Sequence, residues 1–192
     1  MTTRAEQREQ TRARIVAAAL EAFADQGFDG TSTRDIAARA EVTQGLVTYH
    51  FETKDDLWRA AADHLFEDVF ASLPDDFGDL DGADELTRNA VRAGVRLAAR
   101  RPELFRFMID SGRRDDERMR WLIEAHLDGF FSRFEQLVGE RQLAAHLYYA
   151  VAGAASLLFV SGPECAVLTG MDTTADETIE RHAELLAELF VP

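Results

Sequence analysis

Apolar residues recur at helical spacing through most of this chain, and no stretch alternates polar and apolar residues as a half-buried strand does. Pro74, Gly78 and Gly82 interrupt the pattern in the segment SLPDDFGDLDG. The last predicted helix begins with Thr174 and Glu177 at capping-box spacing. The pattern predicts an all-α fold, with helices over about residues 5–26, 55–69, 84–100, 116–138, 141–160 and 175–190, and another that opens at Pro102.

The stretch from residue 31 to residue 57 reads TSTRDIAARAEVTQGLVTYHFETKDDL and predicts two short helices joined by a tight turn. Hydroxyl side chains at residues 31–33 are suited to cap the first helix, and Thr43 opens the second. Val47 points inward from the second helix, so the polar residues around it fall on other faces. This arrangement is typical of a helix-turn-helix whose second helix enters the major groove of DNA.

Several residues of this stretch occur in the order Thr33, Ala37, Val47, Tyr49-His50-Phe51 and Lys54 to Leu57, which resembles the DNA-binding domain of the TetR family of bacterial repressors. The resemblance covers about residues 10–60. It implies a three-helix DNA-binding domain over residues 1–54, followed by a larger helical bundle for ligand binding and dimerisation over residues 55–192. Glu41 departs from the pattern, because such turns commonly place Gly there, and we expect local strain.

Gln44 is the candidate for reading adenine through a bidentate amide contact. The resemblance implies that Tyr49, His50 and Lys54 contact the sugar-phosphate backbone. The alternative for His50 is a structural role at the domain interface. The alternative for Lys54 is a solvated surface charge. Leu46 and Thr48 replace commoner family residues, so the base preference cannot be copied. The full set of expected DNA contacts is Thr33, Arg34, Thr43, Gln44, Gly45, Thr48, Tyr49, His50 and Lys54.

The formal net charge of −14 is unusual for a DNA-binding protein. Residues 1–60 hold 8 basic and 10 acidic side chains, whereas residues 61–192 hold 13 and 25. Four arginines and two glutamates fall within residues 1–14, so this arm is able to reach phosphate. We therefore expect DNA binding through helix N-termini, hydroxyls and amides, with about 3 to 5 counterions released per half-site.

The second domain is rich in aromatic residues, and the resemblance implies that it holds a small-molecule cavity. For each of these aromatic residues, the alternative is that the ring only fills the hydrophobic core and contacts no ligand. Polar residues at apolar positions are the better indicators of a ligand. The candidate ligand-binding residues are Phe107, Asp110, Trp121, His126, Phe130 and Tyr149.

Small residues cluster over residues 150–155 of one predicted helix, and Ile179, Ala183, Leu186 and Phe190 form an apolar seam on the last. These two helices resemble the pair that TetR-family proteins use for a four-helix dimer interface. An intramolecular pair is the alternative. We expect a homodimer, because a helix-turn-helix protein ordinarily needs a twofold partner to span two half-sites.

The sequence contains no nucleophile elbow, dinucleotide-binding glycine motif, P-loop or zinc-protease motif, so we expect no enzyme and no cofactor. A helical-bundle metalloenzyme is the enzyme alternative, although none of the five histidines has a Glu three residues before it. Asp75, Asp79 and Asp81 lack a Gly at the position that an EF-hand loop requires, which argues against calcium. Cys165 is the only cysteine and excludes an internal disulfide.

The first ten residues are polar, which predicts no secretory signal and a cytoplasmic protein. Residues 142–163 carry no charge, but their apolar run covers only residues 147–160, so we expect a buried or interface helix rather than a membrane span. We expect a transcriptional regulator that represses genes by binding a palindromic operator as a homodimer and that a small-molecule effector releases from the DNA. A constitutive DNA-binding or adaptor protein without an effector is the second hypothesis.

Overall fold

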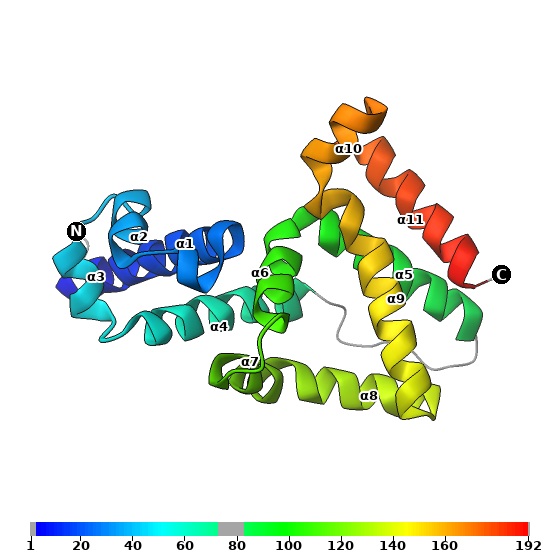
Figure 1. Cartoon of the computed structure of the whole chain (residues 1–192), viewed down its shortest axis with the longest axis horizontal. Helices are drawn as coiled ribbons and strands as arrows, with labels where there is room; N and C mark the ends of the chain where they lie inside the picture. The colour runs from blue at the N-terminus through cyan, green and yellow to red at the C-terminus, as the bar shows by residue number, and fades with distance from the viewer. Residues whose placement is uncertain (1–2, 73–82, 192) are drawn as a thin grey trace. The chain divides into compact units, whose positions relative to one another are not determined.

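The computed structural model describes residues 3–72 and 83–191, and it confirms the all-α prediction, since no strand occurs within those ranges. The predicted acidic loop with Asp75, Asp79 and Asp81 lies outside the described residues. The helices are α1 (Arg4–Gly30), α2 (Thr33–Arg39), α3 (Gln44–His50), α4 (Lys54–Ser72), α5 (Ala83–Arg100), α6 (Pro102–Gly112), α7 (Glu117–Leu122), the π-helix η1 (Ile123–Leu127), α8 (Asp128–Val138), α9 (Arg141–Val160), α10 (Gly162–Thr169) and α11 (Asp176–Phe190) (Figure 1).

Three details differ from the prediction. The helix expected over residues 116–138 is divided into α7, the π-helical turn η1 and α8. A short helix that the sequence pattern did not predict, α10, follows α9, and Pro163 occupies its first turn. The expected capping box of the last helix is wrong, because the Thr174 backbone N–H and hydroxyl both donate to Asp172 Oδ1 (2.8 and 2.7 Å), and Ala175 is the N-cap.

The described residues divide into two compact units. One extends to Phe70 and takes in Arg106–His126, and the other contains Ala71–Phe105 and the residues after His126. The chain therefore passes from the second unit to the first within α6 and returns within η1. The predicted functional boundary after residue 54 stays a prediction.

The first unit is built on the apolar faces of α1 to α4. Buried residues recur on α1 at helical spacing, and Ile36, Val47 and Leu57 contribute one fully buried side chain each from α2, α3 and α4. Phe28 and Val42, two apolar residues of the same unit, are only half-buried. The buried side chains that hold this unit together include Ile15, Ala19, Ala22, Phe23, Ile36, Ala37, Val47, Phe51, Leu57, Trp58, Ala61 and Leu65.

The turn between α2 and α3 follows a Schellman motif. The backbone N–H of Glu41 donates to Ala38 O (3.2 Å), and that of Val42 donates to Ala37 O (3.0 Å). The motif requires a left-handed residue after the C-cap Ala40, and Glu41 supplies it with φ 54°. Among the described residues, Glu41 is the one non-glycine with positive φ, as the sequence had indicated.

Glu41→Gly is expected to raise the free energy of unfolding by about 0.5–1 kcal/mol. The left-handed conformation costs a residue with a Cβ about 1–2 kcal/mol, and the added freedom of glycine in the unfolded chain offsets part of that gain. Urea unfolding followed by circular dichroism measures the difference. Glu41→Ala, which removes the carboxylate but keeps the Cβ, is the control, and an equal gain in both variants would show that charge rather than backbone strain is responsible.

The second unit has its core between α5, α9 and α11. The buried cluster contains Val91, Val95 and Ala98 of α5, Ala155 and Phe159 of α9, and Ala183 and Leu186 of α11. Ile179 and Phe190 pack against the same cluster. The seam predicted to face a second protomer is thus used within the chain, and the intramolecular alternative holds for these residues. The helical period identified the apolar face correctly, but it does not specify which helix covers that face.

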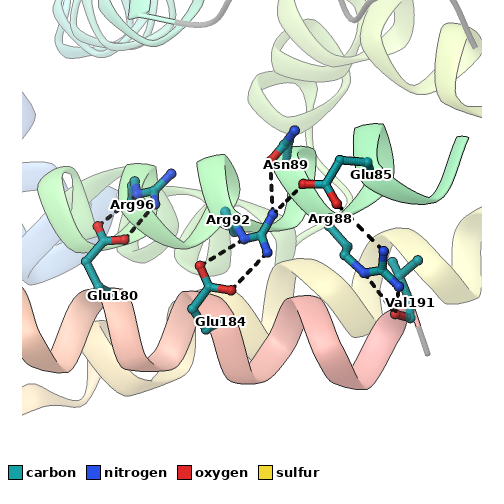
Figure 2. A network of polar contacts seen from close by, with 8 residues as sticks. All are labelled: Glu85, Arg88, Asn89, Arg92, Arg96, Glu180, Glu184 and Val191. Atoms are coloured by element: carbon teal, nitrogen blue, oxygen red, sulfur yellow. Dashed lines mark hydrogen bonds and ion pairs between the residues drawn. The ribbon is translucent and has the colours of Figure 1, made fainter. Parts of the chain in front are cut away.

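A row of ion pairs fixes α11 alongside α5 (Figure 2). Arg92 Nε and Nη2 donate to the two carboxylate oxygens of Glu184 (3.0 and 2.9 Å), and Arg96 binds Glu180 in the same bidentate way (2.8 and 2.6 Å). Arg88 donates twice to the carbonyl oxygen of Val191 (3.2 and 2.9 Å), just beyond the end of α11. Pairs this exposed contribute little stability each, but together they set the register of the two helices.

Helix α9 is the one described helix that is long and apolar enough to cross a membrane, with a mean hydropathy of 1.7 in its most apolar window. Length and composition are weak evidence by themselves, because core helices of soluble proteins pass the same test. Here α9 packs against α5, α8 and α11. Of its most apolar window, 22% is buried within the chain, and the expectation of a buried or interface helix stays a prediction.

Candidate nucleic-acid interface

The helix-turn-helix is positioned by caps and by buried anchors. Ser32 and Asp35 form a reciprocal capping box at the start of α2, with Asp35 N donating to Ser32 Oγ (3.1 Å) and Ser32 N donating to Asp35 Oδ2 (3.3 Å). Thr43 is the N-cap residue of α3 as expected, but its side chain makes no capping hydrogen bond. Val47 is buried and anchors α3, so the other faces of this short helix remain accessible.

The accessible face of α3 carries the residues predicted to read DNA. Gln44, Gly45 and Thr48 are exposed, and Tyr49 is 65% exposed. Gln44 Nε2 donates to Thr33 Oγ1 over 3.4 Å, a long bond that leaves the amide able to turn toward a base. Thr48 Oγ1 donates to Gly45 O (3.1 Å), which leaves its oxygen lone pairs and its methyl group for other contacts.

His50 is half-buried at the end of α3. Burial lowers its pKa below the ordinary value, and the nearby guanidinium groups of Arg8 and Arg12 lower it further, against the opposing effect of Glu9. The neutral imidazole is therefore favoured at neutral pH. A neutral ring offers one N–H donor to a phosphate rather than a full positive charge.

Lys54 lies at the start of α4 with its Nζ 4.2 Å from the ring centroid of Phe28. Arg118 of α7 approaches the same ring at 3.6 Å from its Cζ. Burial is the main cause of a lowered Lys54 pKa, with Arg118 adding to it, while Asp29 and Asp55 oppose it. In this conformation the ammonium group is occupied by a cation–π contact. Its expected phosphate contact stays a prediction.

The arginine-rich arm expected to reach phosphate forms the first turns of α1 and lies beside α3. Arg4 and Arg8 of α1 line an open groove together with Tyr49 and His50 of α3. The spacing of Arg4, Arg8 and Arg12 is the sequence signal that could have identified this face of α1, because residues four apart lie on one side of a helix. Thr33 and Arg34, the other predicted contacts, lie in the first turn of α2, where Arg34 is exposed.

Four of the six candidate ligand residues lie in the first unit, where Phe107, Trp121 and His126 belong to one aromatic cluster. Phe107 is 1% exposed and stacks on Trp58 with ring centroids 5.2 Å apart. His126 stacks on Phe66 (4.6 Å), makes an edge contact with Trp121 (5.4 Å), and has Nε2 3.0 Å from Asp63 Oδ1. Asp110 accepts a hydrogen bond from Phe28 N (3.3 Å) at the end of α1.

The other two candidates belong to the second unit. Tyr148 connects them, since its ring centroid lies 6.3 Å from that of Phe130 and 5.2 Å from that of Tyr149. Burial raises the pKa of the Tyr148 hydroxyl, whereas Tyr149 is 74% exposed. The six residues therefore fall into two groups on separate units, and their role in ligand binding stays a prediction.

Comparison with known sequences places the helix-turn-helix among regulators. A model of "bacterial regulatory proteins, tetR family" matches residues 15–61. The HTH-type transcriptional repressor Rv3405c of Mycobacterium tuberculosis is 53% identical over 58 residues, which are 30% of this chain and 31% of that protein. The HTH-type transcriptional regulator BetI of Burkholderia thailandensis is 34% identical over 65 residues, 34% of this chain and 33% of that protein. The matches thus span about a third of these curated relatives.

Solved structures are similar over nearly the whole chain but at low sequence identity. A putative fatty acid metabolism regulator of Clostridium perfringens has a TM-score of 0.70 at 16% identity and covers 93% of this chain and 96% of that chain. FadR of Bacillus subtilis, solved in complex with stearoyl-CoA, has a TM-score of 0.67 at 16% identity and covers 93% and 97%. These likenesses show a shared fold. The match to the TetR family of bacterial regulatory proteins therefore covers the helix-turn-helix segment, residues 15–61, and the rest of the chain shares the fold of these solved regulators.

Proposed function

We propose that this protein is a transcriptional repressor that binds an operator as a homodimer and releases it when a small molecule binds. The observation that carries the proposal is the accessible face of α3, where an exposed amide and an exposed phenol lie on a helix anchored by one buried valine. That is the arrangement a recognition helix needs, because base-reading groups have to be free while the backbone is held in place.

Exposed apolar side chains on the second unit support the homodimer. Tyr149 and Leu157 of α9 are 74% and 63% exposed, and Val167 of α10 is 91% exposed. Leu185 and Leu189 of α11 are also exposed, at 47% and 68%. Ala150 and Gly153 are exposed on the same helix as Tyr149, so a second copy is able to approach closely there. This surface replaces the predicted seam of α11 as the proposed interface.

The proposed effector rests on the family and on its neighbours. FadR of Bacillus subtilis, which shares the fold, binds stearoyl-CoA in its solved structure. In this chain the rings of Phe130 and Phe131 contact the ring of Tyr148, and we propose that this aromatic cluster takes part in binding the effector. The alternative, a constitutive DNA-binding protein, requires no effector. A compound that raises the thermal midpoint and also weakens operator binding separates the two.

Selection of binding sites from random duplex DNA by the purified full-length protein is the direct test. Enrichment of an inverted repeat supports a dimeric protein that reads sequence, and the selected duplex then serves as the probe for effector screening. Folded protein that enriches no sequence at low salt would overturn the proposal.

Gln44→Ala is expected to reduce discrimination at one base position per half-site by about 1–3 kcal/mol, because the bidentate amide contact is lost. Competition binding with single-base variants of the selected duplex measures the effect. Lys54→Gln is the matched comparison, since loss of a phosphate contact weakens binding to all sequences about equally. An unchanged base preference in Gln44→Ala would remove Gln44 from the assigned contacts.

A further inference from the structure

The first turns of α1 and the helix α3 line an open groove with a volume of about 450 Å³. Arg4, Arg8, Thr11, Tyr49 and His50 are among its lining residues. No acidic residue belongs to the described lining. The carboxylate of Glu6 instead accepts a hydrogen bond from the Thr3 backbone N–H (2.7 Å) in the capping box of α1. The groove therefore combines positive charge with hydroxyl and imidazole donors.

Two arginines of this face cover aromatic rings of α3 and its C-cap, and none of the three pairs with a carboxylate in the described part of the chain. Arg8 has its Cζ 5.6 Å from the ring centroid of Tyr49, and Arg12 has its Cζ 5.3 Å from that of Phe51. Within the described part of the chain, no carboxylate lies within 4.0 Å of the guanidinium nitrogens of Arg4, Arg8 or Arg12. Other arginines of the same unit do have such partners, for example Arg39 with Asp25 (3.3 Å). Guanidinium groups without an internal partner are available to an external anion.

The shape of this charged face favours an extended anion over a compact one. Arg4 and Arg8 line the groove about 6 Å apart along the helix axis, and Arg12 continues the same face of α1 beyond the groove, about 12 Å from Arg4. A single small anion does not span that length, whereas a phosphodiester backbone presents one charge after another along it. The same groove includes Tyr49 of α3, whose neighbours on the helix are the proposed base-reading residues.

We propose that the groove between α1 and α3 binds the DNA phosphate backbone beside the major groove, with Arg4 and Arg8 as phosphate ligands. Arg8 is also a positioning residue, because its guanidinium group covers the ring of Tyr49 and holds the phenol toward the same strand. The inference rests on the proposed DNA-binding function and deepens it. It explains how a segment with 8 basic and 10 acidic side chains in its first 60 residues attracts a polyanion.

The test measures operator affinity against salt concentration for the full-length protein and for Arg4→Gln/Arg8→Gln. Each phosphate contact contributes about 0.9 to the slope of log K against log salt, so the double variant is expected to lower the slope by about 2 per half-site. Base preference in competition binding stays unchanged, since phosphate contacts carry no sequence information. Arg8→Lys keeps a cation and is expected to keep the slope.

Arg14→Gln is the matched control, because Arg14 is an exposed arginine of α1 that does not line the groove. Its slope is expected to equal that of the wild type. The groove assignment is overturned by an unchanged slope in Arg4→Gln/Arg8→Gln, or by an equal change per charge in Arg14→Gln. In either case the proposed function still stands if the wild type binds a selected duplex with sequence preference. Failure of the wild type to bind any selected duplex overturns both. Circular dichroism on every variant checks that the α-helical fold is kept.

Discussion

Gly27→Ala is expected to lower the free energy of unfolding by about 2–4 kcal/mol. Gly27 interrupts α1 with φ 70° and ψ 174°, a conformation that is essentially restricted to glycine and costs other residues about 1–3 kcal/mol. An added Cβ would also lie 2.8 Å from both carboxylate oxygens of Asp110. Asp110 has to move away, and the hydrogen bond from Phe28 N is then lost. Urea unfolding followed by circular dichroism measures the change.

Gly112→Ala is the matched control in the same unit, because nothing lies within 4 Å of its added Cβ and its φ is not positive. It should leave stability unchanged or raise it slightly. Asp110→Ala in the Gly27→Ala background removes the steric conflict, so the double variant should lose less stability than the sum of the two single variants. A Gly27→Ala protein as stable as the wild type would contradict the described end of α1.

Phe107→Ala is expected to lower the free energy of unfolding by about 3–5 kcal/mol, because it removes a fully buried ring and leaves a cavity. The lost ring also ends the stacking contact with Trp58, which is itself buried. This result identifies Phe107 as a core residue whose loss weakens the whole first unit. A direct contact with an effector predicts a different result, namely reduced effector affinity in a protein of normal stability.

Two variants help to separate these outcomes. Phe107→Leu keeps most of the buried volume and is expected to cost about 1–1.5 kcal/mol. Tyr49→Ala removes an aromatic ring that is 65% exposed, so its cost should stay within about 1 kcal/mol. Equal losses in Phe107→Ala and Tyr49→Ala would contradict the burial of Phe107.

Helical periodicity and cap residues allowed most of the fold to be predicted. The predicted ranges for α1, α5, α9 and α11 agree with the structure to within a few residues, because their apolar positions repeat with the helical period. The strained turn at Glu41 was also predictable, since its position in the motif demands a left-handed residue. The π-helical turn η1 was not, because one extra residue in a turn changes the period too little to be seen in the pattern.

The partners of each apolar face were not predictable in the same way. Periodicity shows that Ala183 and Leu186 share a face of α11, but only the packed structure shows that α5 and α9 cover it. Asp110 looked like a ligand-orienting group because it is polar among apolar neighbours. In the structure its carboxylate contacts a backbone N–H at the end of α1, a pairing across 82 positions that no local signal encodes.

The discontinuous first unit has a consequence for synthesis of the protein. Helices α1 to α4 leave the ribosome first, but Phe107, Trp121 and His126, which cover the rings of Trp58 and Phe66, come from a segment that follows the whole of α5. Until that segment emerges, the nascent chain exposes an aromatic surface that the finished unit buries. The first unit therefore completes its folding only after residues of the second unit have been translated, and a chain that stops at Phe70 lacks these partners.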